Sequence, residues 1–154
     1  MSWYTIKHSC GHEERVQIYG TNVHGERDKK AAWMASRPCS ECLLKAEEER
    51  LGISSELKGS EKQVAWARKI RAKMVGEVAA LCAQADANLD KGGDPRYEAI
   101  RPCWAALRDD ALSDLRGQES AAWYIDHKDD DTNRFVLQLV AKACTEAGYD
   151  PTKG

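Results

Sequence analysis

The sequence predicts an α+β fold that is mainly helical, with a small N-terminal module followed by a helical domain. Two short segments near the N-terminus, 3–7 and 15–19, are rich in strand-forming residues. Beyond position 60, apolar residues recur instead at three- and four-residue steps, the period of amphipathic helices. A chain of 154 residues has room for such a module beside a larger domain. We predict three parts: a module at 1–52, a linker at 53–60 and a helical domain at 61–150.

The N-terminal module is predicted to be a hairpin followed by two helices. Its two strand segments flank a turn that contains Gly11, so they can pair as a two-stranded hairpin. Residues 25–37 then predict a helix that Pro38 closes. A second, charged helix is expected at 43–51, where Gly52 stops it.

The helical domain opens with a strong start signal. Ser60 is a suitable N-cap, and Gln63 stands three residues on as its capping-box partner. The helix that follows is expected to run to about Ala87 and to bury an apolar stripe of Val64, Ala67, Ile70, Met74, Val78, Leu81 and Ala85. A loop at 88–96 then leads to helices at 97–108, 109–116, 119–128 and from about Asp131 to Gly148, with breaks at Pro102 and Gly117. The core face predicted for the last helix is Val136, Leu139, Val140, Ala143, Cys144 and Ala147.

Four residues in the N-terminal module have the spacing of one metal site: Cys10, His12, Cys39 and Cys42. The two-residue gap between Cys39 and Cys42 lets both thiolates reach one ion from a tight turn, and Cys10 and His12 can do the same from a second turn. Three thiolates and one imidazole suit tetrahedral Zn²⁺. Because the set fills all four positions, we predict a structural zinc ion rather than a catalytic one.

Other assignments of these side chains remain open at this point. A reduced thiol pair beside an unrelated surface histidine is the simplest alternative. His8 could replace His12 as the ligand, and His24 is a weaker candidate.

A hairpin and a helix that meet at three cysteines and one histidine form the layout of zinc ribbons and treble clefs. So small a sheet has almost no core, and structural zinc can contribute about 10–16 kcal/mol to such folding.

Charge is unevenly distributed along the chain. The net charge is −2, yet residues 52–75 hold six basic and two acidic side chains, whereas residues 76–154 hold nine basic and fifteen acidic ones. The middle of the chain is therefore cationic and the C-terminal half is anionic.

Part of the cationic segment forms a row on one side of the predicted long helix, made of Lys62, Trp66, Lys69 and Lys73. Lysines so placed can neutralise phosphates, and an indole can stack on an unpaired base. The alternative is that Trp66 packs against the zinc module or the C-terminal helices while the lysines merely solvate the helix. Arg71 falls in the apolar arc, which predicts a stem along the core or an ion pair.

Aspartates gather in the C-terminal half, at Asp109, Asp110, Asp114, Asp126, Asp129, Asp130 and Asp131. We interpret them mainly as solvated surface, and residues 129–131 as favourable charge at a helix N-terminus. A docking surface that imitates a phosphate backbone is the second interpretation. A divalent-cation site is the third.

No catalytic constellation stands out, and we predict that the protein is not an enzyme. The sequence has no glycine-rich phosphate-binding loop, and its four histidines leave little for acid–base catalysis once one or two bind zinc. Segments 12–14 and 38–42 match the two halves of the zinc-deaminase signature, but Cys10 would fill the position that such enzymes keep for water. That signature also places its histidine at a helix start, whereas His12 is expected between strands.

The rest of the composition points to a cytoplasmic protein. No segment approaches the roughly 18 apolar residues of a membrane span, and the first residues have neither a basic start nor an apolar signal stretch. In a reducing compartment, cysteines serve as ligands or buried thiols rather than as disulfides. Cys82, Cys103 and Cys144 lie in apolar helical stretches and are expected to be small core residues.

Four stretches, spread in order over most of the chain, resemble a known group of proteins. They are residues 10–12 with 16–20, residues 37–42, residues 59–67 and residues 121–126. Together they resemble small, mostly uncharacterised zinc-ribbon proteins carried on bacterial phages, plasmids and conjugative elements. The resemblance implies a bound zinc ion and a bacterial mobile-element setting, and it implies no activity.

These observations lead to one functional hypothesis and one alternative. The hypothesis is a non-enzymatic, zinc-stabilised accessory protein that binds nucleic acid through the lysine row and Trp66. The alternative is a protein-binding adaptor or inhibitor, which would use the acidic C-terminal half to dock on a nucleic-acid-handling protein.

Overall fold

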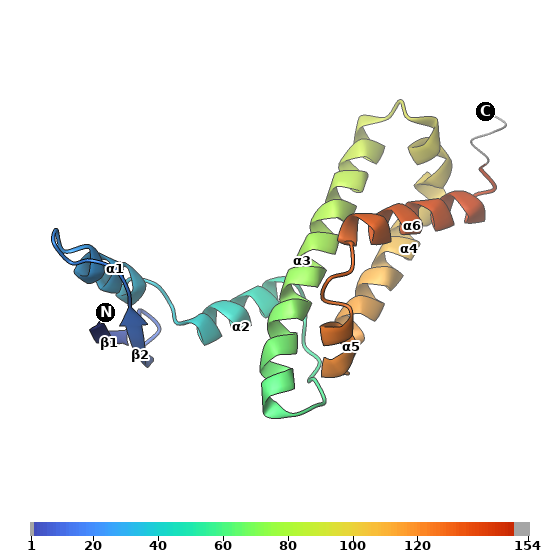
Figure 1. Cartoon of the computed structure of the whole chain (residues 1–154). Coiled ribbons are helices and arrows are strands. Elements are labelled where there is room, and N and C mark those ends of the chain that lie inside the picture. Colours follow the sequence, from blue (N-terminus) through green and yellow to red (C-terminus); the bar gives the residue numbers. More distant parts are fainter. Residues whose placement is uncertain (1, 150–154) are drawn as a thin grey trace. The chain divides into compact units, whose positions relative to one another are not determined.

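The computed structural model describes residues 2–149, and the chain divides into two compact units, Met1–Arg50 and Leu51–Gly154. The first unit contains β1 (Ser2–Lys7), β2 (Glu13–Ile18), α1 (Glu26–Ala35) and α2 (Ser40–Arg50). The second contains α3 (Glu61–Lys91), α4 (Pro95–Gly117), α5 (Ala121–Asp126) and α6 (Thr132–Glu146) (Figure 1). The predicted fold class is confirmed: an N-terminal hairpin precedes helices, and most of the chain is helical.

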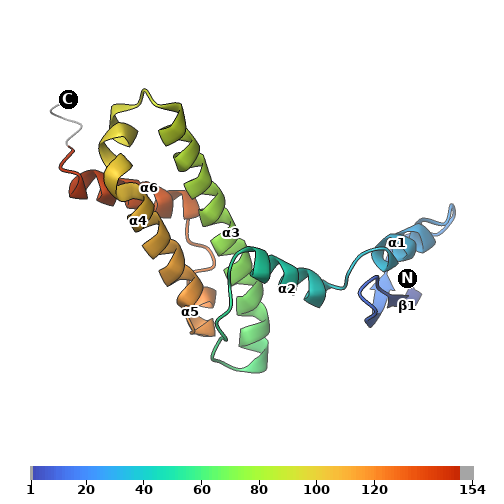
Figure 2. The ribbon, with the colours of Figure 1, turned by 180° about the vertical axis from the view of Figure 1, so that it is seen from behind.

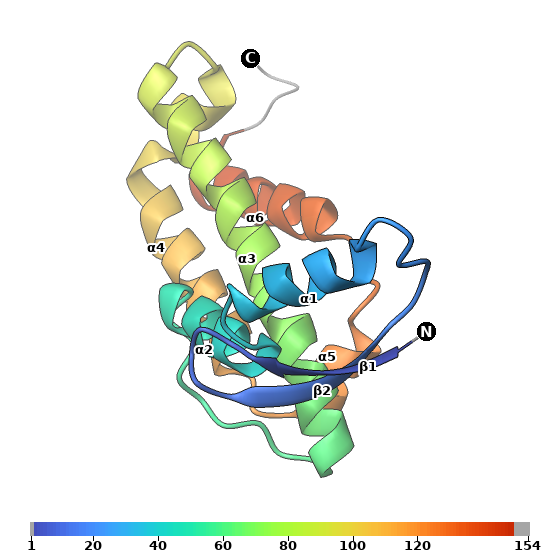
Figure 3. The same ribbon diagram turned by 90° about the vertical axis from the view of Figure 1, so that its left-hand side faces the viewer.

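The first unit is a hairpin with a helix packed on it. β1 and β2 pair antiparallel in a register that runs from Ser2 opposite Ile18 to Lys7 opposite Glu13. Because side chains alternate along a strand, Ile6 and Ile18 are buried while Trp3 stays exposed. Figure 3 shows the paired strands with α1 alongside, in agreement with the contacts between α1 and both strands.

The segment predicted as a linker, 53–60, is instead attached to the second unit. Ile53 is buried, and the Ser55 hydroxyl donates to the carbonyl oxygen of Arg116 at 3.0 Å. Arg71 of α3, itself buried, donates through Nη1 to the Ser55 carbonyl oxygen at 2.8 Å, which ties this segment to α3. The segment also exchanges backbone hydrogen bonds with residues 119–121 through Lys58.

The long helix α3 begins where the sequence predicts and ends later. The Ser60 hydroxyl accepts from the backbone N–H of Gln63, and the Gln63 side chain accepts from the backbone N–H of Ser60, which completes the capping box. The helix continues through residues 88–91, where the sequence predicts a loop, and stops at Gly92, whose φ of 71° favours glycine. Leu89 lies in this extra turn and is buried, so packing extends the helix.

α4 is one continuous helix, so the predicted breaks at Pro102 and between 108 and 109 are wrong. Proline removes one backbone hydrogen bond and normally kinks or ends a helix. Here Ile100 and Trp104, on either side of it, are almost completely buried. The Trp104 indole also donates to the Asp86 carboxylate of α3 at 2.7 Å, and this tertiary packing outweighs the local cost.

The last two helices close the core of the second unit. Asp131 accepts from the backbone N–H groups of Asn133 and Arg134 and caps α6, as expected for an aspartate at this position. The predicted core face of α6 is correct except for Ala147, which follows the helix and is exposed. Figure 2 shows α6 crossing α4, with α5 at the far end of α4. α3, α4, α5 and α6 all contribute buried side chains to this core.

Candidate metal centre

Two turns of the first unit bring the candidate ligands together. Cys10 and His12 lie in the turn between β1 and β2, where the φ of 89° at Gly11 suits glycine. Two backbone hydrogen bonds, from His8 to His12 and from Gly11 to His8, close this turn. Cys39 directly precedes α2 and Cys42 lies in its first turn.

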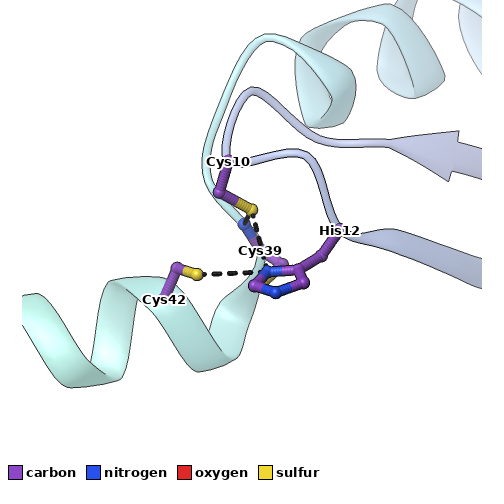
Figure 4. Close-up of side chains that lie close together, drawn as sticks. All are labelled: Cys10, His12, Cys39 and Cys42. Atoms are coloured by element: carbon purple, nitrogen blue, oxygen red, sulfur yellow. Dashed lines mark hydrogen bonds between the residues drawn. The ribbon is translucent and has the colours of Figure 1, made fainter.

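The four predicted side chains converge on one point. The Nδ1 atom of His12 lies 3.4 Å from the Cys10 sulfur, 3.4 Å from the Cys39 sulfur and 3.3 Å from the Cys42 sulfur. All four donor atoms lie within 4.8 Å of one another. Figure 4 shows the three thiols and the imidazole pointing toward this common centre. The cluster can therefore hold a metal ion.

The local electrostatics favour a thiolate at Cys10. The backbone N–H of Cys39 donates to the Cys10 sulfur at 3.3 Å, and together with the backbone of His12 it lowers the pKa of Cys10 to about 6. The neighbouring Cys39 thiol, followed by burial, raises the pKa of Cys42 to about 11. A cation that binds here must therefore displace protons, and binding releases them to solvent.

His8, the alternative ligand, is engaged elsewhere. Its Nδ1 atom lies 2.9 Å from the Met34 carbonyl oxygen and 3.1 Å from that of Arg37, and its Nε2 atom lies 2.9 Å from the Glu14 carboxylate. Burial lowers the pKa of His8, but the Glu14 carboxylate and the two carbonyl oxygens outweigh it and raise the pKa above its usual value. Both ring nitrogens thus face oxygen atoms, and His8 joins the hairpin to the end of α1. His24 is likewise outside the cluster.

The predicted nucleic-acid residues form an exposed row on α3. Lys62, Trp66, Lys69 and Lys73 are all exposed, and 50 % of the Trp66 surface is accessible. Trp66 is therefore not buried against the C-terminal helices of the second unit. Among residues 2–149 the three lysines have no carboxylate within ion-pair distance, and no ring stacks on Trp66.

Two aromatic residues that the sequence analysis did not single out are also exposed. Trp3 is 57 % accessible and carries the Arg15 guanidinium 4.9 Å from its ring centre, and Trp33 is 56 % accessible with Arg37 at 4.8 Å. For Trp3 and Arg15, the alternation of side chains along the two strands is the sequence signal that predicts this contact. Once the hairpin register is known, Trp3 and Arg15 are diagonal neighbours on the outer face.

The aspartates of the C-terminal half are dispersed over several helices and their ends. Asp109 pairs with Arg108, Asp129 pairs with Lys128, and Asp131 caps α6. In the part of the chain that the structure describes, the cysteine and histidine cluster is the one group able to hold a metal ion. The divalent-cation interpretation of the aspartates therefore finds no support.

No family model matches the chain, and neither a curated protein nor a solved structure matches it. Of the helices within residues 2–149, none is both long and apolar enough to cross a bilayer. What the protein does must therefore be inferred from its own residues.

Proposed function

We propose that this protein is a non-enzymatic, zinc-stabilised accessory protein that binds nucleic acid. One observation carries the binding proposal: Trp66 is exposed in the middle of a row of three exposed lysines on a single helix. The resemblance of four stretches to zinc-ribbon proteins of bacterial mobile elements supports the zinc ion and makes such an element our proposed setting.

Zn²⁺ is the proposed ion because the donors and their spacing suit it. Zinc–sulfur and zinc–nitrogen bonds of about 2.3 and 2.0–2.1 Å at tetrahedral angles separate sulfur from nitrogen by about 3.6 Å. The three observed sulfur–nitrogen distances are 3.3–3.4 Å. Four protein ligands leave no position for water, so the ion would serve as a scaffold. His12 also lies in a hairpin turn rather than at a helix start, unlike the histidine of zinc deaminases.

The geometry of the row suits a nucleic-acid strand. Lys62 and Lys73 are eleven residues apart, which on an α-helix is about 16 Å, or roughly five phosphates of one duplex strand. The lysines would neutralise phosphates along this length. Trp66, between them, offers an uncovered ring face to an unpaired base, and such stacking is worth about 1–3 kcal/mol per base. We therefore propose a preference for single strands.

Binding should be measured by fluorescence anisotropy with the zinc-loaded full chain and labelled single-stranded DNA, single-stranded RNA and duplex DNA over a range of salt. On single strands we expect the log–log slope against salt to be about −0.7 per phosphate contact. The double variant Lys69→Ala/Lys73→Ala should make that slope shallower by about 1.4. Trp66→Ala should weaken single-strand binding by about 5- to 150-fold and leave the slope unchanged.

A matched variant tests whether position matters. Lys91→Ala/Lys142→Ala also removes two exposed lysines from the second unit, away from the row. It should bind as the unchanged chain does. The proposal is wrong if none of the three nucleic acids binds at low salt, or if this variant loses as much affinity as the double variant within the row.

A further inference from the structure

The second unit has an apolar groove between α4 and α6, with Trp123 of α5 at one end. Leu107, Ala111 and Leu115 line it from α4, and Phe135 and Leu139 line it from α6. Its volume is about 440 Å³, and a neighbouring cavity of about 250 Å³ shares Leu115, Trp123 and Phe135 with it. The three α4 side chains are four residues apart, so they form a straight wall along one face of the helix.

The lining of this groove is partly exposed, and the tryptophan at its end is held by two neighbouring rings. Phe135 is 39 % accessible. Trp123 is only partly buried, although it stacks on the His127 ring at 4.2 Å and meets the Tyr124 ring edge-on at 5.1 Å. A surface that is already fixed loses little conformational freedom when a partner covers it, which favours binding.

The rim of the groove is acidic. Asp110 and Asp114 of α4 line the groove itself, and Asp130 and Asp131 line the neighbouring cavity. Among the residues that the structure describes, the one lysine or arginine that lines either of them is Lys142. Asp110 and Asp114 are exposed, and within residues 2–149 no cation lies within ion-pair distance of either carboxylate. Two free carboxylates one helical turn apart, beside apolar side chains, complement an apolar segment with basic flanks and repel phosphate.

We propose that this groove docks a basic amphipathic helix from a partner protein. Its apolar side chains would lie between Leu107 and Phe135, and its lysines or arginines would lie over Asp110 and Asp114. A helix fits better than a strand because both walls are helices and offer no free backbone edge for strand pairing. From Leu107 to Gln118 the wall is about 16 Å long, enough for roughly three helical turns.

A second copy of this chain is a poorer occupant. Its own basic row on α3 contains one apolar side chain, Trp66, among lysines. The groove offers a continuous apolar length, and a row with a single apolar side chain would leave most of that length uncovered. The groove also lies on side chains other than the nucleic-acid row, so the two proposals stand or fall separately.

The probe is a labelled synthetic peptide of about 18 residues with leucines on one helical face and lysines flanking them, added to the zinc-loaded full chain. Two peptides serve as controls: one with the same composition in shuffled order, and one with glutamates in place of the lysines. By fluorescence anisotropy we expect the first peptide to bind at least about tenfold more tightly than either control. No nucleic acid is present, so failure of the nucleic-acid proposal would not affect this result.

Variants locate the binding in the groove. Asp110→Asn/Asp114→Asn should weaken binding of the basic peptide by about 3- to 10-fold and reduce its salt dependence. Phe135→Ala should weaken it by about 5- to 10-fold without changing that dependence. Asp90→Asn/Glu146→Gln removes two exposed carboxylates elsewhere in the second unit and should change binding less than about twofold. Thermal melting monitored by circular dichroism verifies that every variant is folded.

Three results would overturn the proposal. The first is equal binding of the ordered and shuffled peptides, or none of the ordered one. The second is that the groove variants leave the affinity for the basic peptide unchanged, or that the control variant lowers this affinity as much as they do. The third is self-association in light scattering that Asp110→Asn/Asp114→Asn abolishes, since a second copy would then occupy the groove.

Discussion

The two units of this chain are stabilised in different ways. Among the described residues of the first unit, the buried apolar side chains are Ile6, Ile18 and Cys39. The second unit buries side chains from all four of its helices, including Trp104 and Tyr124. A small module cannot remove enough apolar surface from water to offset the chain entropy it loses, whereas a larger helical unit can. We therefore expect the first unit to depend on a metal ion held by its cysteine and histidine cluster, and the second unit to fold without one.

The sharpest way to break this comparison is to remove the metal. A chelator should unfold the first unit and leave the second folded, because structural zinc contributes about 10–16 kcal/mol in small modules. The helical signal in far-ultraviolet circular dichroism should fall only by the share of α1 and α2, which have 10 and 11 residues. The helices α3, α4, α5 and α6, with 31, 23, 6 and 15 residues, should keep their signal. Nuclear magnetic resonance should show the signals of residues 2–50 collapse while those of the second unit stay dispersed.

Two cysteine variants serve as controls for chelation. Cys39→Ser should reproduce the effect of the chelator. Cys103→Ser, in the second unit, should bind one zinc ion as before, because its thiol only donates to the carbonyl oxygens of Ile100 and Ala143. A chelated chain that keeps the hairpin signals would show that the first unit does not depend on a metal.

The converse experiment removes the core of the second unit. Trp104 is 1 % accessible and donates to Asp86, so Trp104→Ala should lower the free energy of unfolding by about 3–5 kcal/mol. Urea denaturation followed by circular dichroism measures this loss, and zinc stoichiometry should stay at one. Trp66→Ala, which truncates an exposed tryptophan of the same unit, should cost less than about 0.5 kcal/mol.

The two histidines of the hairpin sharpen the comparison within the first unit. His12→Ala should weaken zinc binding by more than about 100-fold, because even outer-sphere partners of a metal are worth 10- to 100-fold. His8→Ala should keep one bound zinc ion but lower the melting temperature, since His8 joins Glu14 to the end of α1. Competition with a chromogenic chelator separates the two variants. The assignment is wrong if His8→Ala loses the metal and His12→Ala keeps it.

The parts of this structure that follow from short-range sequence signals are those that the sequence predicted well. The Ser60–Gln63 capping box and the buried face of α6 depend on residues three or four positions apart. The cysteine and histidine spacing likewise reports local turns. Each of these signals has one dominant physical cause, so it can be interpreted without the rest of the fold.

The parts that depend on tertiary packing could not be predicted in this way. Nothing near Pro102 shows that Ile100 and Trp104 will be buried on both sides of it, yet that burial keeps α4 continuous. The choice between His8 and His12 depends on carbonyl oxygens 26 and 29 residues away. The attachment of Ser55 to Arg116 spans 61 positions and turns an expected linker into part of the second unit.

The smallest effect expected concerns one buried hydroxyl of the second unit. Tyr124 is fully buried, and its hydroxyl donates to the carbonyl oxygen of Leu115; burial also raises the pKa of Tyr124 above its usual value. Tyr124→Phe should lower the free energy of unfolding by about 1–2 kcal/mol, because it removes this bond and leaves a buried carbonyl oxygen without its partner. Urea denaturation detects such a change.

Tyr97→Phe is the matched control, since its hydroxyl only accepts from Asn88 at the surface and its loss should cost less than about 0.5 kcal/mol. Zinc affinity decides what the result means for the whole chain. If the two units fold on separate sources of stability, Tyr124→Phe leaves the affinity for zinc unchanged. A parallel loss of zinc affinity would mean that the core of the second unit also supports the cysteine and histidine cluster of the first unit.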